Sequence, residues 1–263
     1  MELKISILNA DGQVLAEACG ENRVFLEYKA AYQPGDVLCL SSNESGCHVV
    51  AQLEDSLAAT YGVLNGESRL PVPFEERRIC YSSKAFTGEC HLLWARAATE
   101  EEISARRNLA LNPMDCHANN GLFPHAFANV ETRGEASFEA RNAIDGIFAT
   151  EGHGVYPYSS WGINRDPNAA LTIDFGRAVT IDEVAVTLRN DFPHDNWWQS
   201  AVIRFDDGSS ETLHFEKVPY PQHTKIAPRT VRSAVLEQLI QCPEDPSPFP
   251  ALTQLELWGT EAK

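Results

Sequence analysis

The chain has 263 residues, of which 43% are hydrophobic and 22% are charged, and its formal net charge is −16 at pH 7. A chain this acidic repels phosphate backbones and anionic lipid surfaces, so we expect neither nucleic acid nor a membrane as a partner. The length allows two modest domains, each with a hydrophobic core.

The first ten residues alternate charged and apolar side chains, and no run of about 18 apolar residues follows. The sequence therefore predicts neither a signal peptide nor a membrane-spanning helix. The seven cysteines are an odd number without a Cys-x-x-Cys pair. That pattern is typical of reduced thiols rather than of a disulfide framework or a zinc ribbon, and it favours a cytoplasmic location.

Short strands separated by turn residues dominate the first part of the chain. The strand predicted at residues 2–8 is followed by the turn Ala10-Asp11-Gly12, in which glycine accepts the positive φ that a hairpin needs. Further strands are predicted at residues 13–17, 23–29, 37–40, 48–53, 60–64, 78–82 and 91–95, with the polar segment 41–46 as a loop. Strands this short and closely spaced predict an all-β sandwich or jelly roll over residues 1–97.

Residues 97–107 interrupt the β pattern. Thr99 and Glu102 form a capping-box pattern, and the three glutamates of residues 100–102 favour a helix N-terminus. Arg106 and Arg107 suit the C-terminal end of such a helix. We therefore predict two β-sandwich (jelly-roll) domains joined by a short helix, with residues 98–107 as the linker and residues 108–263 as the second domain.

The second domain begins with an irregular segment, residues 116–135, and ends with a proline-rich loop at 243–250. His117 and His125 lack the short spacing that marks a zinc site, so we interpret them as loop histidines. Strands are predicted at residues 170–175, 183–189, 200–205, 211–215, 230–240 and 252–259. The segment 230–240 also fits a helix, although we favour a strand.

Four pieces of this domain occur in a set order. They are Ala140-Arg141-Asn142-Ala143-Ile144-Asp145-Gly146, Leu171-Thr172-Ile173-Asp174-Phe175-Gly176, Ile181-Asp182-Glu183-Val184-Ala185-Val186-Thr187-Leu188-Arg189 and Leu255-Glu256-Leu257-Trp258-Gly259. Together they resemble the galactose-binding-like β-sandwich, also called the discoidin or coagulation-factor type C domain, which carbohydrate-binding modules share. The resemblance covers roughly residues 108 to 262. It implies the fold but not the ligand, because this fold hosts many functions.

The resemblance also implies a structural calcium ion beside the Asp-Gly loop, as in many members of the family. Asp145 and Thr150 match ligand positions there, and a turn can supply the six to eight oxygens that calcium needs. The family commonly has a glutamate where this chain has Gln254, which removes one negative charge. The predicted metal ligands are Asp145, Thr150 and Gln254; the alternative is that Asp145 only caps its turn through side-chain hydrogen bonds.

Two loops of the second domain gather rings and hydrogen-bonding groups. A sugar has an apolar C–H face, which an aromatic ring covers, and a rim of hydroxyls, which charged and amide groups bind. One loop follows the strand at 183–189 and the other is the insertion 151–160; we expect both at one end of the sandwich, where binding loops lie. The predicted ligand-binding residues are His153, Tyr156, Tyr158, Trp161, Arg189, Asp191, His194, Trp197 and Trp198.

These residues also have structural interpretations. Trp197 and Trp198 are adjacent, so in an extended chain they point to opposite sides and one of them is expected in the core. Trp161 fits a core ring equally well. The structural interpretation of Arg189 is that it pairs with Asp191 and does not contact a ligand.

The sequence contains none of the common catalytic motifs, although His194 with Asp191 or Asp195 fits an acid–base pair. The leading hypothesis is a non-catalytic carbohydrate-binding protein. One alternative is a sugar-processing enzyme, glycosidase- or lyase-like, with a His/carboxylate site between the domains. Another is a protein–protein interaction module or a homo-oligomer, because protein interfaces also favour exposed rings.

Overall fold

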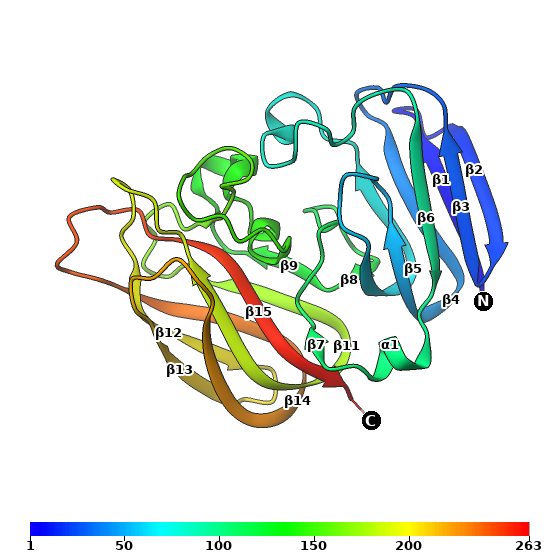
Figure 1. The fold of residues 1–263 in the computed structure, drawn as a ribbon. Helices are drawn as coiled ribbons and strands as arrows, with labels where there is room; N and C mark the ends of the chain where they lie inside the picture. The colour runs from blue at the N-terminus through cyan, green and yellow to red at the C-terminus, as the bar shows by residue number, and fades with distance from the viewer. Residues whose placement is uncertain (263) are drawn as a thin grey trace.

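The structure, a computed structural model, describes residues 1–262; Lys263, the last residue of the predicted second domain, lies outside the described residues. Two antiparallel sheets lie side by side (Figure 1), which confirms the all-β prediction. The only α-helix among the described residues is the short α1 (Glu100–Ser104). None of the helices in residues 1–262 has the length and apolar character needed to cross a membrane.

The first sheet has seven strands. They are β1 (Glu2–Leu8), β2 (Val14–Glu21), β3 (Arg23–Tyr28), β4 (Val37–Gln52), β5 (Thr60–Pro71), β6 (His91–Ala97) and β8 (Leu122–Phe123). The long strand β4 pairs with β1 through its first half and with β6 through its second half. The prediction of two strands around a loop at 41–46 was therefore wrong: the polar residues form an irregularity in one bent strand, where the register with β5 shifts between Ser41 and Cys47.

The second sheet has eight strands. They are β7 (Arg107–Asn108), β9 (His125–Ala128), β10 (Trp161–Gly162), β11 (Leu171–Leu188), β12 (Trp198–Phe205), β13 (Ser210–His214), β14 (Gln222–Gln241) and β15 (Ala251–Glu261). The strands predicted at 170–175 and 183–189 are the two halves of β11, which bends at Gly176 (φ 66°). The segment 230–240 lies in β14 and is a strand, as we favoured.

Two further predictions concern residues 78–82 and the linker helix α1. Residues 78–82 do not form a strand, because the one-turn 3-10 helix η1 (Glu75–Arg78) and the following turn satisfy the backbone locally, with the Tyr81 amide donating to the Arg78 carbonyl. The capping box of α1 is confirmed: Glu102 N donates to Thr99 Oγ1 and Thr99 N to the Glu102 carboxylate. Arg107 Nη1 donates to the Glu102 carbonyl at 2.7 Å, so it does close the helix C-terminus.

The irregular segment between α1 and β9 contributes to both sheets. Leu109 and Ala126 pack in the core of the second sheet, whereas Met114 and Leu122 pack in the core of the first. Phe123 of β8 lies against Gly176 at the bend of β11, where even one added methyl group would come within 2.3 Å of its ring. The two sheets are therefore joined by packing as well as by the linker.

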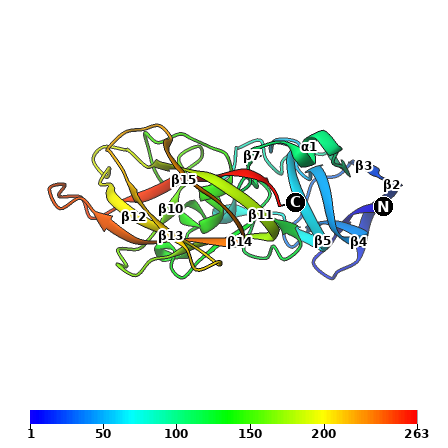
Figure 2. The ribbon, with the colours of Figure 1, turned by 90° about the horizontal axis from the view of Figure 1, so that it is seen from below.

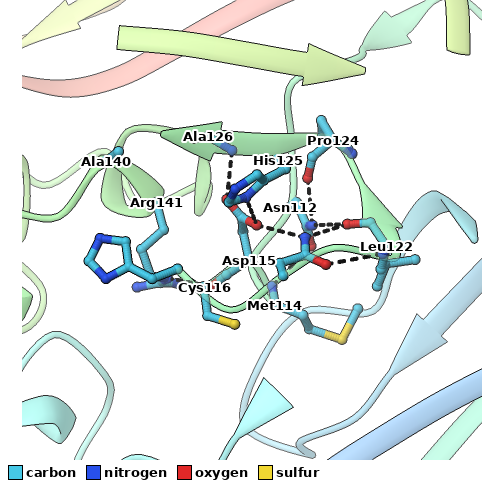
Figure 3. A network of polar contacts seen from close by, with 12 residues as sticks. Asn112, Met114, Asp115, Cys116, Leu122, Pro124, His125, Ala126, Ala140 and Arg141 are labelled. Atoms are coloured by element: carbon cyan, nitrogen blue, oxygen red, sulfur yellow. Dashed lines mark hydrogen bonds and ion pairs between the residues drawn. The ribbon is translucent and has the colours of Figure 1, made fainter. Parts of the chain in front are cut away.

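A buried polar network fixes this segment (Figure 3). The carboxylate of Asp115 is 0% exposed and accepts three hydrogen bonds, each 2.8 Å long. Their donors are Asn119 Nδ2, His125 Nδ1 and the Ala126 amide. Arg141 Nε donates to the Asp115 carbonyl, also at 2.8 Å. His125 is thus a structural histidine. Burial disfavours its charged form, but the hydrogen bond to Asp115 raises its pKa overall.

The loops of interest lie at one end of the molecule. The proline-rich loop between β14 and β15, orange-red in Figures 1 and 2, projects at the end farthest from the N-terminal sheet. The loop after β11 and the residues after β10 reach the same end of the second sandwich, where they line one cavity.

Candidate functional site

A cavity of about 360 Å³ opens between these loops. Its lining comes from four separate stretches of the second half of the chain, together with His153 of the insertion. They supply Thr132, Arg133 and Phe138; residues 162–165; Arg189 and His194; and residues 248–251. A volume of this size is within the range of small-molecule sites, about 300–1,000 Å³.

Phe249 supplies the aromatic surface of the cavity. Its ring is exposed (43%), although Phe249 lies between Pro248 and Pro250, whose fixed φ angles restrict the local backbone. The ring of His194 meets the Phe249 ring at a centroid distance of 5.8 Å, and the guanidinium of Arg165 lies 5.5 Å from the same ring centroid. An apolar face is thus held beside groups that can form hydrogen bonds.

Arg189 and Asp191 form the buried frame behind the cavity. They are 5% and 2% exposed, and Arg189 Nε lies 2.5 Å from Asp191 Oδ1. Arg189 Nη2 donates to the carbonyl oxygens of His194 (3.0 Å) and Phe249 (2.6 Å), so one side chain ties the loop after β11 to the proline-rich loop. The other carboxylate oxygen of Asp191 is paired with Nδ1 of His153. Burial lowers the pKa of Arg189, while the charge of Asp191 opposes that shift.

The structure therefore brings together His153, Arg189, Asp191 and His194 of the nine predicted ligand-binding residues. His153, Arg189 and His194 of this group line the cavity, and the two histidine rings meet edge to face at 4.7 Å. Arg189 also pairs with Asp191, which is the pairing that we weighed as the alternative, and this pair positions the loops. The convergence of the insertion with the loop after β11 is as expected.

The tryptophans and tyrosines lie elsewhere. Trp161 and Trp198 are completely buried in the core, with ring centroids 6.3 Å apart, so neither has surface to offer a ligand. Trp198 is the core ring, as expected of one of the pair, but Trp197 is half-buried and packs against the same core, so neither tryptophan is an exposed ring on the opposite side. Tyr156 lies near the 3-10 helix η1, where its amide donates to the Ile79 carbonyl, and the ring of Tyr158 lies against Gly152.

Several cavity residues were missed by the sequence analysis, above all Phe249, Asn164 and Arg165. A signal for Phe249 was present in its two flanking prolines, which mark a rigidly held ring. Asn164 and Arg165 lie in a polar turn before Pro167 that carried no pattern of its own. Their role depends on which loops meet in space.

The predicted calcium ligands lie together, but one of them presents a hydrogen-bond donor to the others. Gln254 Nε2 donates to Asn142 O (2.7 Å), Asp145 Oδ1 (2.8 Å) and Thr253 O (2.6 Å). Gln254 Oε1 accepts from the Gly146 amide at 2.9 Å, which fixes the orientation of the side-chain amide.

Asp145 Oδ2 and Thr150 Oγ1 are buried without a partner among the described residues, as calcium ligands would be. Even so, calcium requires six to eight oxygens directed at one point, and here the NH₂ group of Gln254 occupies that point and donates to the surrounding oxygens. The donor set as arranged does not fit a calcium ion. Burial raises the pKa of Asp145 to about 6, although the charge of Arg141 opposes the shift.

The acid–base pair proposed for a catalytic site is not formed. Within residues 1–262 the ring of His194 has no carboxylate partner, Asp191 is bound to His153, and Asp195 pairs with Lys217 at 3.3 Å. A separate cavity of about 280 Å³ does lie between the two halves of the chain, lined by residues 71–81 and 116–141. It contains His117, whose Nε2 contacts Glu131 at 2.8 Å and whose Nδ1 lies 3.5 Å from Glu139.

Comparison with known proteins gives matches to solved structures alone, since no protein-family model and no curated protein matches the sequence. A chitosan-binding module of a chitosanase/glucanase from Paenibacillus sp. IK-5 is 17% identical, with a TM-score of 0.40, over 58% of this chain and 99% of that module. The family 32 carbohydrate-binding module of C. perfringens NanJ, solved with galactose, is 18% identical, with a TM-score of 0.38, over 51% of this chain and 91% of that one.

The lectin domain of lectinolysin, solved with the Lewis B antigen, is 16% identical, with a TM-score of 0.41, over 59% of this chain and 98% of that domain. These neighbours are carbohydrate-binding modules and lectin domains, the kind of domain that the second half of the sequence resembles. All three TM-scores lie below 0.5, so the likeness does not identify a ligand of this chain.

Proposed function

We propose that this protein is a non-catalytic carbohydrate-binding protein and that the sugar binds in the cavity beside Phe249. The observation that carries the proposal is an exposed aromatic ring held between two prolines and surrounded by hydrogen-bonding side chains. The apolar face of a pyranose would lie on the Phe249 ring, while its hydroxyls would reach the rings of His153 and His194 and the amide of Asn164.

The rigidity of the cavity favours binding. Arg189 ties two of its loops together through the carbonyls of His194 and Phe249, so little loop entropy would be lost when a ligand binds. The proline-flanked ring is similarly restricted before any ligand arrives. Pre-organisation of this kind allows useful affinity from a modest contact area.

The composition of the lining supports a binding role over a catalytic one. Hydrolysis of a glycosidic bond generally uses two carboxylates placed on either side of it. The residues that line this cavity, all of them described, include neither Asp nor Glu. The nearest carboxylate of the frame, Asp191, is buried and already paired with Arg189 and His153.

The test is a glycan array followed by calorimetry, with Phe249→Ala as the variant. Losing a stacked ring costs about 1.5 kcal/mol or more, so affinity should fall about ten-fold. Phe192→Ala is the matched control: Phe192 is 89% exposed in the neighbouring loop but does not line the cavity, so its removal should leave the affinity unchanged. Absence of sugar binding at millimolar concentration, or equal affinities of Phe249→Ala and the parent protein, would rule the proposal out.

The interaction-module alternative gives the opposite result in the same samples. A homo-oligomer or protein partner that uses the exposed Phe192 would be weakened by Phe192→Ala and not by Phe249→Ala. Sedimentation of the parent protein and of both variants distinguishes the two cases.

A further inference from the structure

The cavity has a charge that contrasts with the rest of the protein. The chain has 37 acidic residues against 21 lysines and arginines. Yet the lining holds three arginines, Arg133, Arg165 and Arg189, and two histidines, without any acidic residue. In a protein whose overall field repels anions, this cavity is a local exception, and a cleft lined by one sign of charge concentrates ligands of the other sign.

The three arginines differ in what they are free to bind. Arg189 is buried and committed to Asp191 and to two backbone carbonyls. Arg133 forms a two-pronged pair with Glu135, through contacts of 2.6 and 2.9 Å. Arg165 has no carboxylate partner anywhere in the described chain, and its guanidinium is placed only against the ring of Phe249. It is therefore the cation that is available to a ligand.

The backbone that presents Arg165 is unusual. Asn164 and Arg165 have φ values of 49° and 61°, a left-handed conformation that asparagine tolerates and arginine rarely adopts. The turn is held by the Asn164 amide, which donates to Thr132 Oγ1 at 2.9 Å, and by the Asp166 amide, which donates to the Ile163 carbonyl, also at 2.9 Å. Strained residues of this kind persist where the surrounding structure enforces them, and they cluster at binding sites.

We propose that the ligand is an acidic sugar, a uronic acid residue whose carboxylate binds the guanidinium of Arg165 while its ring lies on Phe249. This inference rests on the proposed function and specifies its substrate class. Arginine binds a carboxylate through two parallel hydrogen bonds, which a neutral hydroxymethyl group cannot reproduce. The Phe249 ring and the guanidinium already lie next to each other, so one ligand can contact both.

Calorimetry with matched sugars tests the inference on the full chain. Galacturonate and glucuronate are compared with galactose and glucose, which differ from them only at C6. We expect the preferred uronate to bind about ten-fold more tightly than its neutral parent, and we expect this difference to shrink at high salt, because ions screen an exposed charge pair.

The variant Arg165→Gln retains hydrogen-bonding capacity but loses the charge. It should reduce uronate affinity about ten-fold and reduce the affinity for the neutral parent by a clearly smaller factor, because only the uronate loses a charged partner. Arg232→Gln, which removes an exposed arginine on β14 away from the cavity lining, should change neither affinity.

The outcomes separate the two proposals. Equal binding of uronate and neutral parent, or equal loss of both in Arg165→Gln, would overturn the acidic-sugar inference and leave sugar binding in place. Failure of every sugar to bind the parent protein would instead remove the proposed function itself.

Discussion

The side chain of Gln254 makes a sharp prediction about metal dependence. Its NH₂ group lies among the Asn142 carbonyl, the Thr253 carbonyl and Asp145 Oδ1, and its oxygen accepts from the Gly146 amide. Changing Gln254 to Glu keeps the shape of the side chain but replaces the donor with an oxygen. That oxygen would then lie about 2.8 Å from a second carboxylate, in a site that is almost fully buried.

The expected cost follows from these contacts. The carbonyl oxygens of Asn142 and Thr253 lose their N–H donor, at about 1 kcal/mol each, and the carboxylate of Asp145 gains an unpaired like charge as neighbour. We therefore expect Gln254→Glu to lower the free energy of unfolding by about 3 kcal/mol without metal. For a chain of this size the melting temperature should fall by roughly 10 °C.

Thermal unfolding with EDTA and with millimolar calcium chloride provides the assay. The variant has the oxygens and the charge that calcium needs, so calcium should restore about 4 kcal/mol if its concentration is about a thousand times the dissociation constant. The parent protein and the surface control Gln13→Glu should melt at the same temperature in both buffers. A calcium-dependent rise in the melting temperature of the parent protein would refute the argument that an amide occupies the place of the metal.

Three further predictions concern stability. Burial raises the pKa of Asp145 from 3.8 to about 6, so the free energy of unfolding should be highest below pH ~4 and should fall by about 3 kcal/mol as the pH rises through about 6. Asp145→Asn should flatten this pH dependence when the free energy of unfolding is measured with urea. Asp115→Ala strips three buried donors of their acceptor and should cost about 3 kcal/mol in urea denaturation, whereas a cost near zero would mean that the network is not structural. Thr99→Ala removes the cap of α1 and should cost about 1 kcal/mol, readable as a small loss of melting temperature; an unchanged value would mean that the linker helix frays freely.

The sequence predicted the strands well but not their continuity. Alternation of apolar residues located most strands to within a few residues, because each strand buries one face. The same rule divided β4 and β11, since the polar residues 41–46 and the bend at Gly176 interrupt the alternation without ending the strand. Residues 78–82 place Ile79, Cys80 and Tyr81 between two polar residues, as a short strand can, yet among the described residues they pair with no strand and form a turn instead.

The sequence likewise predicted only part of the candidate site. His153 and His194 were found because rings and polar groups gather locally in two loops. Phe249 lies more than 80 residues after Arg165 in the sequence, and no local pattern indicates that they meet. Trp161 and Trp198 were misleading for the opposite reason: a tryptophan beside a loop has the same local sequence whether its ring faces the core or the solvent.

The connection between the sheets has a practical consequence for anyone who wishes to reuse the binding half. β8 and β9 are separated by a single residue, yet β8 pairs with β5 in the first sheet and β9 with β11 in the second. A fragment cut at residue 108 would carry Leu122 without the core that receives it and would leave Phe123 against Gly176 with one side bare. The second half is therefore not an independent domain that can be fused to other chains, and engineering for sugar recognition should begin from the intact polypeptide.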